Sequence, residues 1–356
     1  MSQNSQLDFR DQSFYVGIDV HKKHWAVTIR SHQMELKTFS MNPSSGELNL
    51  YLQRHYPGGR YHSAYEAGFC GFWIHRQLHN YGIENIVIHA ADVPTNHKEK
   101  TTKTDKIDSR KIARELEKGS LNGIYVPEEF HQQLRSLRRL RMRSVQNQTR
   151  VKNRIKGHLH YYGITIPSQW QYSYWSGHFI NWLQSLSFAY PFAKDYLDFC
   201  LEELQQHRER TANITRKLRQ YCKEYNLMVP INYLRSVVGI GFVTAITLFT
   251  ELIDIDRFPT LNHLAAFVGL VPSVNSSGDR RSERGLTERR NRHLRHILIE
   301  AAWVAARKDP ALTLAFTGLS KRMKKQEAII RIARKLLNRI RFVWKHQQNY
   351  VTAVVQ

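Results

Sequence analysis

Residues 14–30 read FYVGIDVHKKHWAVTIR, and this stretch decides the fold of the first third of the chain. Two runs rich in β-branched and aromatic residues flank the polar turn HKKH, which predicts two antiparallel strands. MELKTFSMN (residues 34–42) continues as a third short strand. Asp19 ends the apolar run YVGID, so its carboxylate is expected at a strand end, where a sheet opens to solvent.

Beyond this antiparallel meander, strands alternate with helices. The pattern predicts a helix around residues 46–54, a strand in RYHSAYEA (60–67), an amphipathic helix that closes on Gly82, and a strand in NIVIHA (85–90). TDKIDSRKIARELEKG (104–119) has an acidic start and a glycine stop, as a helix should. Residues 1–127 are therefore predicted to form an α/β domain around a mixed sheet.

Four carboxylate residues lie at the ends of predicted strands or at the start of a predicted helix. Asp19 and Glu66 end two strands, and the small residues after Glu66 would let a substrate approach closely. Asp105 and Asp108 stand three residues apart at a helix start and so share one face. Taken singly, each also fits an ordinary turn, strand-end or capping charge. Together they predict a cluster of oxygen ligands for Mg²⁺ or Mn²⁺, suited to chemistry on a phosphodiester.

The charge of the chain favours a polyanionic partner. Its 53 Lys and Arg against 30 Asp and Glu leave a net charge of +23, spread over several segments. Ribosomal, chromatin and membrane-surface proteins are also basic, so charge alone does not identify the partner. Three cysteines without a CxxC pair suit a reducing cytosol, and no apolar run approaches the roughly 20 residues that span a bilayer. We expect a cytoplasmic protein with no membrane partner.

Residues 128–228 change to long helical patterns, predicted to form a helical or coiled-coil linker that binds RNA or DNA and dimerises. Spacings of three and four from Leu197 to Tyr225 predict a coiled-coil seam, which a helical hairpin and a dimer would both produce. Residues 131–160 carry nine Lys and Arg and no Asp or Glu, which favours contact with phosphates over a merely solvated face. The residues assigned here to nucleic acid are Arg138, Arg139, Arg141, Arg143, Arg150, Lys152, Arg154 and Lys156.

Residues 229–356 are predicted to form a mainly helical domain. LRSVVGIGFVTAITLFTEL (234–252) resembles a helix-hairpin-helix, in which Gly239 and Gly241 would expose backbone N–H groups to phosphate. The alternative is that these glycines only let two helices pack closely. Residues 321–345 carry ten Lys and Arg over an apolar face, as an amphipathic helix does.

Residues 272–290 are predicted to form a loop in which Ser276 and Ser277 precede Gly278 among many arginines. A serine beside guanidiniums can attack a phosphodiester, because the cations offset the charge that develops. A flexible phosphate clamp is the alternative. The basic residues of this half assigned to nucleic acid are Arg280, Arg281, Arg284, Arg289, Arg292 and Lys335. The histidine pairs His21/His24 and His293/His296 lack further zinc ligands, so no zinc site is expected.

The motifs VGIDVHKKHWAV, YEAGFCGFWIHRQL, KTDKIDSRKIAREL and FVGLVPSVNSSG together resemble the DEDD transposases of bacterial insertion sequences. The resemblance covers nearly the whole chain and implies a RuvC-like, ribonuclease-H-like domain, a helical linker and a C-terminal transposase domain. One departure is that Arg290 precedes Asn291 where the family usually has a Gly-Asn pair, so this turn is expected to be built differently. The residues it implies as catalytic are the metal-binding tetrad Asp19, Glu66, Asp105 and Asp108, and the nucleophile Ser277, with Ser276 as the alternative.

The resemblance also implies an activity and partners. The family excises its element as a circle and inserts it into target DNA, guided by an RNA encoded beside the gene. The family assembles dimers, in which the tetrad and the serine of different protomers meet. The resemblance leaves open whether the assembly of this chain is a homodimer or a tetramer. Such a protein would work on the bacterial nucleoid. The target sequence, the element ends and the guide RNA leave no trace in the side chains.

Two other functions fit the same residues. A RuvC-like metal-dependent nuclease that hydrolyses branched DNA with water needs only the tetrad, so Ser277→Ala would leave its cleavage intact. A non-catalytic nucleic-acid-binding protein needs no divalent metal, and its binding would survive Asp105→Ala.

Overall fold

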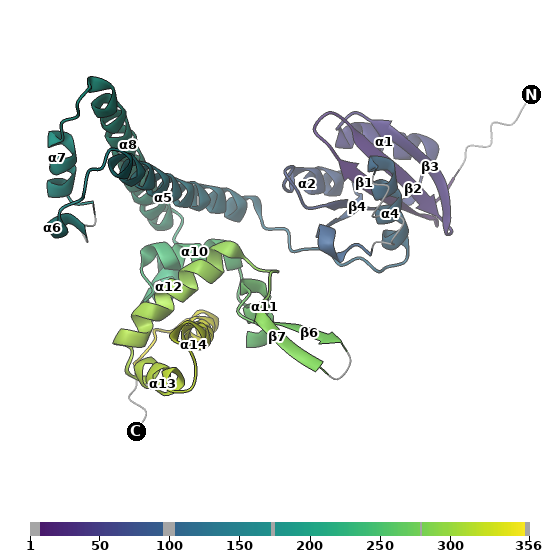
Figure 1. Cartoon of the computed structure of the whole chain (residues 1–356). Helices are drawn as coiled ribbons and strands as arrows, with labels where there is room; N and C mark the ends of the chain where they lie inside the picture. The colour runs from purple at the N-terminus through teal and green to yellow at the C-terminus, as the bar shows by residue number, and fades with distance from the viewer. Residues whose placement is uncertain (1–7, 95–103, 172–174, 278–279, 353–356) are drawn as a thin grey trace, which may run out of the picture. The chain divides into compact units, whose positions relative to one another are not determined.

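The computed structural model describes residues 8–94, 104–171, 175–277 and 280–352 of the chain. The chain divides into two compact units, Met1–Val126 and Pro127–Gln356. The first unit contains the mixed sheet, and the second contains the long helices and the C-terminal helices (Figure 1).

A five-stranded mixed sheet forms the centre of the first unit, with the strand order β3-β2-β1-β4-β5. The β1–β2 and β2–β3 pairs are antiparallel, whereas the β1–β4 and β4–β5 pairs are parallel. The predicted meander followed by alternating strands and helices is thus confirmed, and the sheet is ribonuclease-H-like. The strands are β1 (Ser13–Val20), β2 (Trp25–Ser31), β3 (Met34–Met41), β4 (Arg60–Glu66) and β5 (Glu84–Ile88).

Helices cover both faces of this sheet. Successive side chains of a strand alternate between faces, so Phe14, Val16 and Ile18 of β1 share one face. There they form an apolar core with the two helices that follow β3 and β4. Gly17 belongs to the opposite face, which the last helix of the unit covers. The helices are α1 (Ser45–His55), α2 (Trp73–Asn80), the short 3₁₀ helix η1 (Ala90–Asp92) and α4 (Asp105–Glu117).

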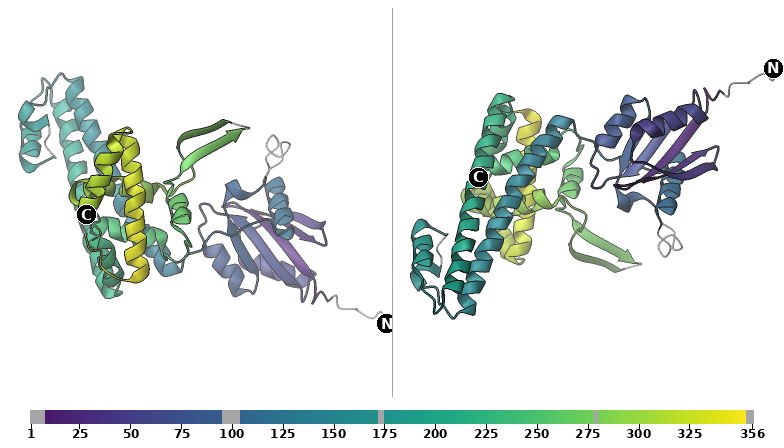
Figure 2. Two further views of the ribbon diagram at one scale, coloured as in Figure 1. Left: turned by 90° about the horizontal axis from the view of Figure 1, so that it is seen from below. Right: turned by 90° about the horizontal axis from the view of Figure 1, so that it is seen from above.

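Two long helices, α5 (Glu129–Tyr161) and α8 (Pro191–Glu224), lie side by side in the second unit (Figure 2). They are antiparallel, because Arg141 near the start of α5 bonds Thr215 while Arg154 near its end pairs with Glu203. The predicted seam is thus filled within the chain, as the helical-hairpin alternative requires. Its buried members are Leu197, Cys200, Leu204, Ile214 and Leu218.

The far end of the α5–α8 pair has an apolar core of its own, to which α6 (Ser168–Gln171) and α7 (Gly177–Ser185) are joined. The near end belongs to the main core of the unit, since Leu134 and Leu218 cluster with the C-terminal helices. The predicted domain boundary at residue 228 stays a prediction. The seam was predicted to continue to Tyr225, but Cys222 is buried there and Tyr225 is 52% exposed.

The C-terminal helices pack around this main core. The predicted amphipathic character of the last helix is confirmed, because Ile329, Ile332, Leu336 and Ile340 are all buried along one stripe. The helices are α9 (Met228–Ser236), α10 (Phe242–Leu252), α11 (Leu261–Val268), α12 (Arg292–Lys308), α13 (Pro310–Ser320) and α14 (Lys325–His346).

The predicted serine loop is instead an antiparallel hairpin of β6 (Pro272–Ser277) and β7 (Arg280–Leu286). The prediction of a loop was wrong because residues 278 and 279 form a Gly-Asp dipeptide, which is typical of two-residue hairpin turns. These two residues lie outside the described part of the chain. Across the described ranges, no helix is both long and apolar enough to cross a membrane.

Candidate active site

The ends of two parallel strands place Asp19 and Glu66 near each other. Ile18 of β1 is paired with Tyr65 of β4, and each carboxylate residue comes directly after one member of this pair. Asp19 also lies two positions after Gly17, so it shares the face of the sheet that α4 covers. The sheet therefore directs two of the predicted tetrad residues toward α4.

Close packing of α4 brings the second pair of carboxylates to the same place. A Cβ atom on Gly17 would lie only 2.2 Å from the Ser109 carbonyl oxygen, so only glycine permits this approach. A buried hydrogen bond of 2.9 Å between the hydroxyl groups of Thr28 and Ser109 ties β2 to the same turn of the helix. The Thr104 side chain caps α4, and Asp105 and Asp108 occupy its first turn, as predicted.

Two histidines contact this acidic cluster. His21 lies between two carboxylates, with its Nε2 atom 3.2 Å from Asp19 Oδ2 and 3.4 Å from Asp105 Oδ1. His24 Nε2 lies 3.0 Å from Asp105 Oδ2, and the two imidazoles are stacked with ring centroids 5.2 Å apart. Sequence reasoning treated both histidines as part of a basic turn. Their positions two and five residues after Asp19, in a turn leaving the same strand end, were the available signal.

The charges of the cluster act on one another. Burial raises the pKa of Asp19, and the negative charges of Asp105 and Asp108 raise it further, against the opposing effect of His21. The hydrogen bond with His24 lowers the pKa of Asp105. A bound cation would therefore stabilise the ionised form of Asp19.

A divalent cation fits this donor set. One ligand atom each from Asp19, His21 and Asp105 lies within 4.8 Å of the other two. Carboxylate oxygens are the ligands that Mg²⁺ and Mn²⁺ prefer, and Mn²⁺ also accepts imidazole. Asp108, half-buried in the first turn of α4, acts on Asp19 through its charge, and Glu66 directly follows Tyr65, the strand partner of Ile18.

Ser277 lies in the other unit, at the end of β6. Its backbone is paired with that of Arg280, and Ser276 is paired with Arg281. Of residues 273–277 and 280–284 only the backbone is described, so the predicted roles of these serines and of Arg284 stay predictions. Figures 1 and 2 show the hairpin extending away from the helices of its own unit.

Two arginines predicted to bind nucleic acid pair with one buried carboxylate. Arg138 is 3% exposed and pairs with Glu251 of α10, which is 2% exposed. Arg139 donates two hydrogen bonds to the same carboxylate, at 2.9 and 2.8 Å. The prediction was wrong for Arg138, because its guanidinium is enclosed by protein and bound to an anion. Sequence reasoning missed Glu251, which stands in an apolar run without a nearby cation.

Glu251 also holds the start of α12. Asn291 donates a hydrogen bond of 3.0 Å to Glu251 Oε2, and its own side-chain oxygen accepts from the backbone N–H groups of His293 and Leu294. Burial acts to raise the pKa of Glu251, but Arg139 and Arg138 hold it at about 2. One carboxylate therefore joins α5, α10 and the chain that leaves the serine hairpin.

The remaining basic residues of α5 differ in what they contact. Arg141 bonds Thr215, Lys152 lies 5.6 Å from the centre of the Trp175 ring, and Arg154 pairs with Glu203. Arg141 and Arg154 thus bond across the helix pair, and Lys152 contacts the segment before α7. Those with exposed side chains include Arg143, Arg150 and Lys156, and, in the C-terminal half, Arg289, Arg292 and Lys335.

The two glycines of the predicted helix-hairpin-helix have different surroundings. Gly239 has a φ of +90°, and a Cβ there would lie 2.6 Å from the Ala301 carbonyl oxygen of α12. For Gly239 the structure favours the alternative of close helix packing. Gly241 caps α10, and no described atom lies within 4 Å of the position its Cβ would take.

Known protein families match both units. Residues 16–164 match the IS110-type DEDD transposase domain, and residues 231–317 match the transposase family described as IS116/IS110/IS902. The first range contains all four carboxylates, and the second contains Ser277 and Glu251.

Individual relatives agree with these matches. The y4qE protein of Sinorhizobium fredii is 27% identical over 239 residues, covering 67% of this chain and 57% of that protein. The transposase of IS1111A from Coxiella burnetii is 27% identical over 240 residues, covering 66% of this chain and 65% of its own. The IS1533 transposase of Leptospira borgpetersenii is 23% identical over 298 residues, covering 81% of this chain and 84% of its own. The chain spans 57% and 65% of the lengths of the first two relatives. It belongs to the IS110 family of DEDD transposases.

Proposed function

We propose that this protein is the transposase of an insertion sequence, which cuts and rejoins DNA strands with a divalent-metal site and a serine nucleophile. The observation that carries the proposal is the convergence of Asp19 and Asp105 at the end of β1, with ligand atoms within 4.8 Å. Neighbouring carboxylates repel one another, so a bound cation would stabilise their ionised forms.

The tetrad is proposed to hold Mg²⁺ or Mn²⁺ through Asp19, Glu66, Asp105 and Asp108. A bound divalent ion would polarise the phosphate and stabilise the charge that develops on its oxygens. The rigid sheet and the close packing of α4 at Gly17 hold the carboxylates in place before substrate binds. His21 and His24 orient Asp105 through their contacts with its two oxygens.

Ser277 is proposed to attack the scissile phosphate. Its hydroxyl oxygen forms a bond to phosphorus while the bond to one deoxyribose oxygen breaks, and the proton of the serine passes to that leaving oxygen. One DNA end is then joined to the protein, and the other ends in a free hydroxyl. The number of phosphodiester bonds is unchanged, so attack by another DNA hydroxyl can rejoin the strands and release the serine. Arginines of the hairpin would offset the charge of the transition state.

Nucleic acid is proposed to contact exposed cations of α5 and α14, such as Arg143, Arg150, Lys156 and Lys335. Contacts of this kind bind the phosphate backbone and carry little sequence information. A guide RNA that pairs with donor and target DNA would supply the sequence specificity. The active assembly, a dimer or a tetramer of this chain, would work on the nucleoid in the bacterial cytoplasm.

The test is a polymerase chain reaction across the joined ends of the element, with the gene expressed in its native flanking DNA. Circle junctions are expected for the wild type and for Ser276→Ala, and also for Ser282→Ala, a control on the opposite strand of the hairpin. None are expected for Ser277→Ala or Asp19→Asn. Junctions that persist in Ser277→Ala would contradict serine chemistry.

Two further measurements separate the alternatives. Purified Ser277→Ala that still cleaves branched DNA with Mg²⁺ would favour the RuvC-like nuclease. Binding that needs no metal, with no junctions from the wild type, would favour a non-catalytic protein. If tetrad and serine act between protomers, co-expression of Ser277→Ala with Asp19→Asn restores junctions that neither variant forms alone.

A further inference from the structure

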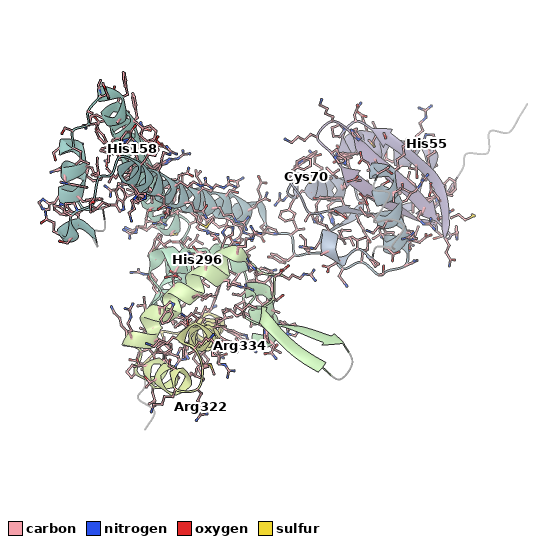
Figure 3. All side chains as sticks on the ribbon, viewed as in Figure 1. His55, Cys70, His158, His296, Arg322 and Arg334 are labelled. Atoms are coloured by element: carbon pink, nitrogen blue, oxygen red, sulfur yellow. The ribbon has the colours of Figure 1, made fainter. Side chains whose placement is uncertain are left out.

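An exposed phenylalanine lies beside the acidic cluster. Phe69 follows Glu66 by three residues and is 64% exposed. Three peptide units separate the Cα atoms by at most about 11 Å, so the ring lies within a few nucleotides of a strand bound at the carboxylates. Cys70, the next residue, is labelled in Figure 3 and marks the loop between β4 and α2.

The loop that carries Phe69 is held to the sheet on both sides. The backbone N–H of Ala67 donates to Ile88 of β5 at 2.8 Å, and the hydroxyl of the fully buried Tyr65 donates to the Gly71 carbonyl at 3.1 Å. Trp73, which follows the loop, packs on the fully buried Trp25 at 6.2 Å between ring centroids. Phe69 is therefore exposed on an anchored loop. Because the backbone of this loop is already held in place, it has little conformational freedom left to lose when a ligand binds.

A cation faces the same ring. Lys22 Nζ lies 5.8 Å from the centre of the Phe69 ring, and Lys22 follows Asp19 by three residues. The ring and the ammonium group thus leave neighbouring strand ends and meet beside the tetrad. An aromatic face next to a lysine matches the alternating bases and phosphates of a single strand, because each base stacks and each phosphate carries one negative charge.

We propose that Phe69 and Lys22 form a subsite for one nucleotide of a single-stranded DNA segment, with the base stacked on Phe69 and its phosphate beside Lys22. This subsite rests on the proposed function, since the strand must reach the carboxylates. Stacking removes the flanking base from its duplex, so the scissile phosphate is presented on an unpaired strand. Stacking is sequence-tolerant, which suits a protein whose specificity comes from pairing with RNA.

The test is fluorescence titration of the full chain with a short oligothymidylate that carries a central 2-aminopurine. This strand has no element ends, so the result does not depend on recombination. The wild type is expected to quench the fluorophore by stacking. Phe69→Ala and Phe69→Leu should lose the quenching and bind about tenfold more weakly. Phe69→Trp should keep both, and so should Tyr81→Ala, an exposed aromatic residue at the end of α2.

Lys22→Ala should remove one phosphate contact. The slope of log affinity against log salt concentration should therefore fall by about one, while quenching persists. Quenching by Phe69→Ala equal to that of the wild type, or no quenching by the wild type, would overturn the subsite. If Phe69→Ala loses self-association but still quenches the fluorophore, Phe69 is a protein contact, and this result would also overturn the subsite. Junction formation by the wild type is measured separately, so a failure of the transposase proposal is distinguishable.

Discussion

The buried carboxylate of Glu251 gives the sharpest stability prediction, and Glu251→Gln is the perturbation. The substitution keeps the shape of the side chain but leaves Arg138, only 3% exposed, without its counter-charge. Removing one partner of a buried ion pair costs about 3–5 kcal/mol. The fall in the pKa of Glu251 from 4.5 to about 2 corresponds to roughly 3 kcal/mol, which agrees in size.

The assay is thermal unfolding of the full chain at neutral pH. For a unit of this size, 3–5 kcal/mol lowers the melting temperature of the second unit by roughly 10 °C. Glu203→Gln is the matched control, because Glu203 also pairs with an arginine of α5, but both side chains are about two-fifths exposed. Exposed pairs contribute about 0–1 kcal/mol, so the control should shift little.

The pH dependence of the same variant tests the cause. Folding lowers the pKa of Glu251, so its contribution is present above pH 4.5 and is lost as the pH falls toward about 2. The difference between wild type and Glu251→Gln should therefore shrink over this range. Burial lowers the pKa of Arg138, but the guanidinium stays charged, so the carboxylate carries the pH dependence. Equal melting of Glu251→Gln and Glu203→Gln, or a constant difference down to pH 2, would refute the reasoning.

Three other substitutions test the site and its support. Gly17→Ala should displace α4 and abolish Mn²⁺ binding measured by calorimetry, because the new Cβ would lie 2.2 Å from Ser109 oxygen; Gly157→Ala, with no described atom within 4 Å, should bind Mn²⁺ normally. Gly239→Ala should destabilise the second unit by about 1–3 kcal/mol in urea unfolding, since its φ is +90° and α12 blocks the added carbon. Burial raises the pKa of Asp19, so ionisation of Asp19 lowers the stability of the metal-free protein above that pKa. In EDTA at pH 7, Asp19→Asn should therefore have a higher melting temperature than the wild type. Mn²⁺ should not raise the melting temperature of Asp19→Asn. An equal Mn²⁺-induced gain in both proteins would contradict the metal assignment.

Local sequence patterns were sufficient for the first unit. Alternating residues in YVGID and SAYE indicated strands, and Thr104 followed by an acidic turn indicated a helix start, all of which the structure contains. These signals involve neighbours within a few positions, where backbone geometry dictates the period. The same patterns placed the tetrad residues at element ends, although their metal-binding role remains a proposal.

Contacts across the fold decided the rest. A sequence pattern records that Arg138 is a cation on a helix, but its partner Glu251 stands 113 positions away, so only folding determines whether it meets phosphate or a buried carboxylate. The sequence around Gly239 likewise fits a phosphate-binding turn, but in the structure α12 packs against this glycine. The sequence by itself determined the mixed sheet, the helical second half and the family. The tertiary structure decided which charged groups are already neutralised, because burial and ion pairing depend on residues that the chain brings together from distant positions.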